Sequence, residues 1–317
     1  MFKTKDMVEA AMLSALFVVL SVIAIGTGIG YSLYLDIMVP LIISLIYLKC
    51  GFKYTALSAI TSLTIIILVI GDIGAGIWMS QSMILGLMCS IFIEKDSEII
   101  DDIVYCTIFA CILMIFIDIY FSKLIGYSFI KEFEAYTSSW SFKYINPQVI
   151  LYVLVACVPA GTVVVAYLGT LIIGNKLKLL SENGVEKFKL IKNYRKVGYY
   201  MCCSKNVILI GITYLALLEV LNLLNYDIKT TYIKVIAISI KYTLLYIVLK
   251  DANSFIGKFL YMKTRSKLIF SLVNLITIVF LVIKFKITSW LMILGDIIIN
   301  LSLDMRNKQL IFLKKCL

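Results

Sequence analysis

The sequence predicts an all-α, polytopic integral membrane protein, a bundle of about ten transmembrane helices. Hydrophobic residues make up 62% of the 317-residue chain and charged residues 15%, against about 45–50% and about 25% in soluble domains. The apolar residues gather in runs that approach the roughly 20 residues needed to cross a bilayer. Lysine and arginine lie almost entirely between these runs, where basic residues orient a membrane protein.

The first apolar run extends from Val8 to Ile25 and follows a short basic N-terminus. It is long enough to span and lacks the small-residue cleavage pattern of a signal peptide, so we predict a retained helix. The later runs lie near 33–48, 54–71, 75–93, 102–122, 148–173, 207–224, 231–249, 267–284 and 287–303. Because backbone groups cannot stay unpaired in lipid, each run is predicted to be helical.

Two long connections interrupt the runs. Residues 123–147 mix aromatic and charged side chains, which predicts an amphipathic segment at the interface or over a cavity. We predict three parts: a six-helix membrane half over 1–175, a basic cytoplasmic loop over 176–206, and a four-helix membrane half with a short basic tail over 207–317. The loop is interpreted as a topology anchor near anionic headgroups, with a docking surface for a cytoplasmic partner as the alternative.

The positions of the basic residues predict the orientation. If the N-terminus is cytoplasmic, most lysines and arginines fall on the cytoplasmic side. This positive-inside pattern predicts a multi-pass protein of the cell membrane, in contact with the lipid bilayer and with both termini cytoplasmic. It also assigns the net charge of +11 to orientation, so we expect no nucleic-acid partner.

The chain contains no histidine, which removes imidazole as a base, proton relay or metal ligand. The eight cysteines form no C-x-x-C pair, so we predict unlinked thiols and no metal site. We find no catalytic cluster and expect neither enzymatic activity nor a cofactor. A carboxylate pair of Asp36 and Asp72 is the alternative that would support catalysis.

Five residues near the predicted outer face are candidates for a small-molecule site: Tyr31, Asp36, Asp72, Trp78 and Gln81. Asp36 follows a glycine-rich turn in which the backbone can approach a ligand closely, and its carboxylate is a candidate to bind a cationic group. Helix capping by Asp36 is the alternative.

Ionisable side chains inside apolar runs are costly in lipid and are therefore functional candidates. These are Asp118, Glu219, Lys234, Lys241 and Asp296. Lys234 and Lys241 are seven positions apart and share a helix face, so either is predicted to pair with Glu219 on the preceding run. The alternative is an ion or proton path.

The opening segment, KDMVEAAMLSAL over residues 5–16, resembles the first helix of energy-coupling-factor (ECF) transporter S components. In that family an A-x-x-x-A patch packs against the transmembrane coupling subunit, and Ala11 and Ala15 match the patch. Residues 35–41 and 49–53 and the pair Gly86-Leu87 are similar to the next helices of the same group. The resemblance covers about the first 175 residues and implies a helix-packing face for a partner at Ala11 and Ala15.

The C-terminal segments Leu294-Gly295-Asp296 and Leu303-Asp304-Met305-Arg306 resemble the ending of the YybS-like family. Its members are uncharacterised membrane proteins of Gram-positive bacteria with an S-component-like front half. The Pro-rich patch of that family is replaced here by Cys202-Cys203. This resemblance implies an architecture and a transport-like origin.

The leading hypothesis is a transport-related subunit that binds a small molecule of unknown identity, similar to an ECF S component. The chain has no G-x-x-x-x-G-K-[ST] loop, so a coupling transmembrane subunit with ATPases would have to act in trans. The alternative is a non-transport membrane scaffold or regulator in envelope assembly or sporulation.

Overall fold

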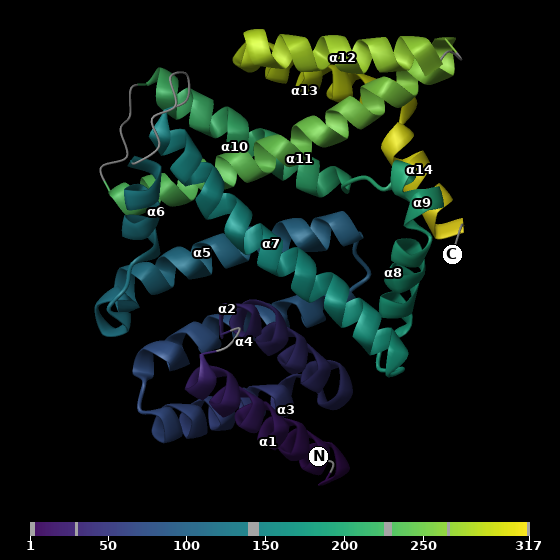
Figure 1. Ribbon diagram of the computed structural model, residues 1–317. Coiled ribbons are helices and arrows are strands. Elements are labelled where there is room, and N and C mark those ends of the chain that lie inside the picture. The colour runs from purple at the N-terminus through teal and green to yellow at the C-terminus, as the bar shows by residue number, and fades with distance from the viewer. Residues whose placement is uncertain (1–3, 29–30, 139–145, 225–229, 265–266, 316–317) are drawn as a thin grey trace. The chain divides into compact units, whose positions relative to one another are not determined.

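The computed structural model describes residues 4–28, 31–138, 146–224, 230–264 and 267–315. All regular structure in those ranges is helical, which confirms the all-α prediction (Figure 1). The chain forms two compact units, one made of residues 1–192 with 230–239 and the other of residues 193–229 with 240–317. Each unit is described below by itself.

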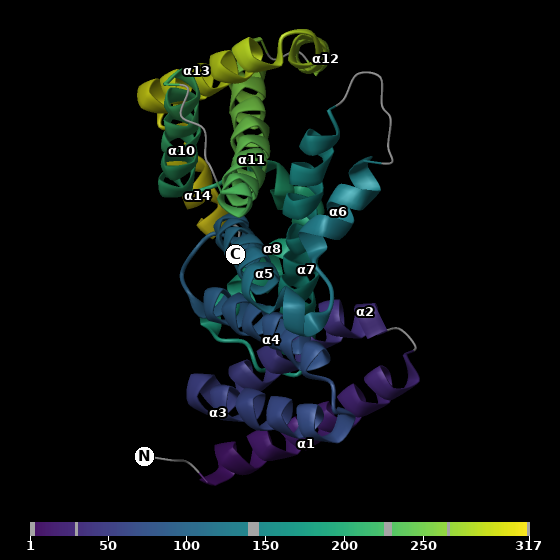
Figure 2. The ribbon, with the colours of Figure 1, turned by 90° about the vertical axis from the view of Figure 1, so that its left-hand side faces the viewer.

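The helices of the first unit are α1 (Thr4–Thr27), α2 (Tyr31–Leu33), the π-helical turn η1 (Tyr34–Met38), α3 (Val39–Ile70), α4 (Ile73–Glu94), α5 (Ile99–Ile125), α6 (Phe129–Ser138), α7 (Pro147–Lys176) and α8 (Glu182–Lys192). Helix α1 packs along α3, α3 packs on α4, and both α4 and α5 pack on α7 (Figure 2). Phe17, Ile43, Ile46 and Met79 are fully buried in the resulting core.

The backbone of α3 is interrupted at Gly51, where φ is 78° and ψ is 172°. This region of φ and ψ is open essentially to glycine alone. It separates two arms, residues 34–50 and 52–70. A straight helix of all 37 residues would be about 55 Å long, well beyond the roughly 30 Å of a hydrocarbon core.

The first arm runs antiparallel to α1. The Tyr34 hydroxyl lies 2.6 Å from the Ser21 hydroxyl, near the end of α1. At the other end of the arm, Lys49 lies 3.4 Å from the Glu9 carboxylate, near the start of α1. The start of the arm therefore faces the end of α1, and the end of the arm faces the start of α1.

The second arm runs parallel to α1. The Ser58 hydroxyl donates to the Ala10 carbonyl at 3.4 Å, and Ser62 lies 2.6 Å from Ser14. The two arms are consequently antiparallel, and α3 is a helical hairpin that turns at Gly51. The predicted runs 33–48 and 54–71 correspond to these arms.

Among the described residues, eight helical segments are long and apolar enough to cross a membrane: Thr4–Thr27, Tyr34–Ile70, Ile73–Glu94, Ile99–Ile125, Pro147–Lys176, Lys205–Leu223, Thr231–Thr264 and Phe285–Leu303. The chain is therefore a multi-pass membrane protein. About ten transmembrane helices are not confirmed, because two predicted runs share the segment Tyr34–Ile70 and because the apolar segment Ser271–Ile283 is shorter than a span. The side on which the termini lie stays a prediction.

Helices α3 and α4 approach closely at Gly86. A Cβ atom added there would lie 2.3 Å from the Pro40 carbonyl oxygen and 2.7 Å from the Pro40 Cα atom. The Ser44 hydroxyl donates a 2.7 Å hydrogen bond to the Gly86 carbonyl at the same place. The small-residue pattern Gly86-x-x-x-Ser90 therefore marks a contact between two backbones.

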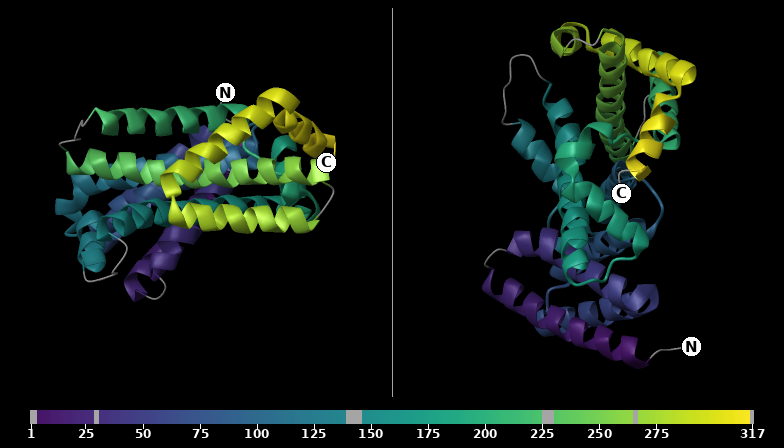
Figure 3. Two further views of the ribbon diagram at one scale, coloured as in Figure 1. Left: turned by 90° about the horizontal axis from the view of Figure 1, so that it is seen from above. Right: turned by 90° about the vertical axis from the view of Figure 1, so that its right-hand side faces the viewer.

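The second unit contains α9 (Tyr194–Val197), η2 (Gly198–Tyr200), α10 (Lys205–Leu223), most of α11 (Thr231–Thr264), α12 (Lys267–Ile283), α13 (Phe285–Leu303) and α14 (Met305–Lys315). Helix α12 turns into α13 at Lys284, and α13 turns into α14 at Asp304, whose φ of 47° is left-handed (Figure 3). Cys202, Phe255, Ile299 and Met305 form a buried cluster of this unit.

Candidate functional site

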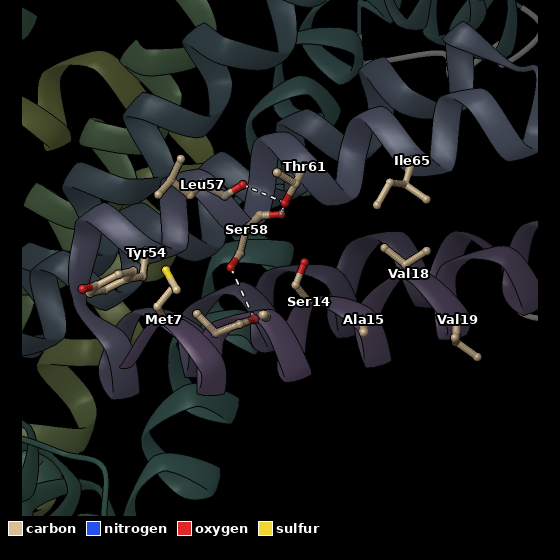
Figure 4. A pocket seen from close by; sticks show the side chains of 12 residues that line it. Met7, Ser14, Ala15, Val18, Val19, Tyr54, Leu57, Ser58, Thr61 and Ile65 are labelled. Atoms are coloured by element: carbon tan, nitrogen blue, oxygen red, sulfur yellow. Dashed lines mark hydrogen bonds between the residues drawn. The ribbon is translucent and has the colours of Figure 1, made fainter. Parts of the chain in front are cut away.

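An open groove of about 440 Å³ runs between α1 and the second arm of α3 (Figure 4). Its α1 wall includes Ala11, Ser14 and Ala15, and its α3 wall includes Tyr54, Ser58 and Thr61. Ala11 and Ala15 are exposed, and their role as a packing face for a partner stays a prediction. Their short side chains leave the α1 backbone accessible from outside the unit.

The hydroxyl groups of this groove already have partners within the unit. Ser14 pairs with Ser62, Ser58 donates to the Ala10 carbonyl, and Thr61 donates to the Leu57 carbonyl at 2.9 Å. The remaining surface of the groove is mainly apolar. Small and apolar side chains with satisfied hydroxyls are suited to the close approach of a second helix in lipid.

The predicted ligand residues do not form one cluster among the described contacts. Asp36 is exposed. Asp72 caps α4 by accepting a hydrogen bond from the Ala75 amide at 3.2 Å. The Tyr31 side chain lies outside the described part of the chain. Within that part, no hydrogen bond or ring contact joins any two of the five residues, and their binding role stays a prediction.

Asp36 lies in the π-helical turn η1 for a reason given by the sequence. Pro40 has no amide hydrogen, so it cannot donate to the Asp36 carbonyl as an α-helix requires. The Val39 amide bonds to the Tyr34 carbonyl, five positions back, which is the π-helical pattern. This wider turn is followed at once by α3.

Trp78 and Gln81 lie on neighbouring turns of α4. The Trp78 ring contacts Phe129 edge-to-face at 4.4 Å between centroids, and Tyr127 at 6.0 Å. The Gln81 Oε1 atom is buried and accepts no hydrogen bond from the described residues. A buried acceptor without a donor costs about 1–3 kcal/mol. This oxygen is the strongest indication of a polar ligand contact among the predicted residues.

Asp118 has a structural role. Its carboxylate accepts hydrogen bonds from the Phe129 amide at 2.7 Å and from the Ser128 hydroxyl at 3.0 Å. The side chain thereby satisfies the N-terminus of α6, the helix within the long 123–147 connection. Asp118 is 2% exposed, so the intramembrane carboxylate is compensated by this contact.

A buried ion pair that the sequence did not reveal holds α8 in place. Lys187 donates to the Asp102 carboxylate at 2.7 Å and to the carbonyls of Phe92 and Lys95 at 2.7 and 2.8 Å. Tyr167 donates to the same carboxylate at 2.6 Å. Lys187 is one of many basic residues in the 176–206 segment, so composition gives no sign of its burial.

The predicted pair of Glu219 and Lys241 is present in the second unit, with 3.6 Å between charged atoms. A second cation, Lys286, lies closer to Glu219, at 2.7 Å. Lys234 belongs to the other unit, and its pairing with Glu219 stays a prediction. The group lines a pocket of about 220 Å³ between α10, α11 and α13.

Asp296 belongs to a buried network centred on Arg306. The guanidinium donates through one nitrogen to Asp251 and the Cys203 carbonyl, and through the other to Asp296 at 3.1 Å. Asn300 donates to Asp296 at 2.7 Å. Burial alone would lower the pKa of Arg306, but the two carboxylates outweigh it and raise that pKa. Arg306 and Asp251 were not predicted; the Asp304-Met305-Arg306 sequence directly after an apolar run was the available signal.

Comparison of the chain with protein-family models, curated proteins and solved structures gives no match. What the fold and its long apolar helices establish is a multi-pass helical membrane protein in contact with the lipid bilayer.

Proposed function

We propose that the protein is a transport-related membrane subunit that binds a small molecule and works with a separate coupling subunit. The observation that supports this most directly is the groove between α1 and α3, because it is exposed, apolar and bordered by Ala11 and Ala15. These residues occupy the positions that resemble the coupling patch of ECF S components. A transmembrane helix of the coupling subunit would lie in the groove, with its ATPases in trans.

The small-molecule part of the proposal is supported by Gln81, whose buried oxygen lacks a donor among the described residues. A ligand donor reaching this atom would recover the cost of burying it. Trp78, on the same helix, offers an aromatic ring nearby in sequence.

A crosslinking experiment tests the docking. A photo-reactive amino acid at position 11 is expected to capture one membrane partner, identified by mass spectrometry as a subunit that itself binds ATPases. Ala15→Leu fills the groove and should abolish that crosslink. Ile23→Phe, which adds bulk at an exposed α1 residue outside the groove, is the control. An unchanged crosslink in Ala15→Leu, or recovery of no ATPase-bound subunit, would refute the proposal.

The second candidate, a non-transport scaffold or regulator, is favoured by the rigid attachment of α8. Lys187 fixes this helix while Lys189 and Lys192 remain exposed, so the unit presents basic side chains at defined positions. Replacing Lys189 and Lys192 together with glutamine should abolish partner contacts if this candidate is right. Full retention of function in that variant, with normal insertion, would rule it out.

A further inference from the structure

The pocket between α10, α11 and α13 contains three charged side chains, Glu219, Lys241 and Lys286. Phe285 and Trp290 contribute aromatic rings to its wall. The Lys286 side chain is 67% exposed, the Lys241 side chain 26% and the Glu219 side chain 19%. Lys286 therefore lies at the entrance, and Lys241 and Glu219 lie deeper.

The pocket carries one more positive than negative charge. Glu219 forms ion pairs with both lysines, at 2.7 Å from Lys286 and at a longer 3.6 Å from Lys241. One carboxylate cannot neutralise two ammonium groups, and Lys241, the less exposed of the two lysines, is the one farther from Glu219. An anion in the pocket would supply the missing charge.

The start of α13 adds to the positive potential. The helix begins at Phe285, which lines the pocket. Its N-cap residue, Lys284, makes no side-chain hydrogen bond to the first amides of the helix. The first amides of a helix carry a partial positive charge. This end supplements the two lysines and would not define a site without them.

We infer that the pocket binds the phosphate of an anionic phospholipid headgroup. Its volume of about 220 Å³ is below the roughly 300–1,000 Å³ of pockets that enclose whole ligands, so it accommodates a headgroup and not the acyl chains. Ile287, Leu291 and Leu294 of α13 are 60%, 62% and 51% exposed and offer an apolar surface for the chains. The inference is independent of the α1–α3 groove.

Native mass spectrometry of the full chain with phosphatidylglycerol tests the site. Lys241→Gln and Lys286→Gln should each weaken lipid binding about tenfold, because each removes one charge-assisted contact. Glu219→Gln should strengthen binding, because it removes the competing carboxylate, and a folding defect would not produce this gain. Lys284→Gln, an exposed lysine two positions before Lys286, is the control.

Three outcomes would overturn the inference. They are equal binding of phosphatidylcholine and phosphatidylglycerol, an equal loss in Lys284→Gln, and weaker binding in Glu219→Gln. Competition with glycerol phosphate separates the possible sources of the phosphate. If this soluble ester displaces the lipid at matched concentration, the site recognises a soluble phosphate and the lipid assignment is wrong.

Discussion

The Nζ atom of Lys187 lies 2.7 Å from the Oδ2 atom of Asp102, although the two residues are 85 positions apart. Their side chains are 6% and 0% exposed. The contact joins α8, in the basic segment after α7, to the first turn of α5. By composition this segment would be a charged loop. The contact instead makes α8 part of the packed first unit.

Lys187→Met is expected to destabilise the protein by about 3–5 kcal/mol, because the buried Asp102 carboxylate loses its cation. Thermal unfolding of the detergent-solubilised chain measures the effect. Lys189→Met changes an exposed lysine two positions away and should shift stability by less than about 0.5 kcal/mol. Similar losses in the two variants would contradict a stabilising role for the pair.

Arg306→Met is expected to cost a similar amount, about 3–5 kcal/mol, since it leaves the buried Asp251 and Asp296 without the guanidinium that pairs with both. Adding Asp296→Asn to this variant should recover part of the loss by removing one of the two like charges. Lys308→Met, on an exposed residue of the same helix, serves as the control. A double variant less stable than Arg306→Met would show that charge is not the reason for the loss.

Gly51→Ala is expected to destabilise the protein by about 1–3 kcal/mol, because a Cβ atom is strained at a φ of 78° with a ψ of 172°. No heavy atom lies within 4 Å of the added carbon, so the effect would report backbone strain alone. Gly26→Ala also meets open space, in ordinary helical backbone, and should be neutral or slightly stabilising. If Gly51→Ala and Gly26→Ala had the same free energy of unfolding, backbone strain at Gly51 would be disproved.

Gly86→Ala is expected to cost about 1–3 kcal/mol for a different reason, overpacking against the Pro40 backbone. A backbone cannot rotate away as a flexible side chain can. Gly161→Ala, in the α7 helix with nothing within 4 Å, is the matched control and should gain stability slightly. Thermal unfolding of both variants separates the two cases, and a stable Gly86→Ala protein would mean that α3 and α4 can move apart.

The sequence was sufficient to predict helices over the long apolar runs, because each run has to satisfy its backbone internally in lipid, but it did not predict α8 within the basic segment. It also placed the interruption of α3, since Lys49 and Lys53 separate two apolar runs. The Glu219–Lys241 pair was predictable because charges in adjacent spans need partners.

The buried contacts of Lys187 and Arg306 were not predictable in the same way. Each connects residues far apart in the chain, and each cation comes from a segment in which basic residues ordinarily face water. Which lysine of such a segment is buried depends on the packing of three helices. Hydropathy and spacing carry no information on that choice.

The reversal at Gly51 also has a consequence for biosynthesis. Because the arms on either side are antiparallel, the end of the second arm lies on the same side of the unit as the start of the first. A chain that failed to fold back here would present every later helix to the translocation machinery with inverted polarity. The direction in which every later helix is threaded therefore depends on this fold-back.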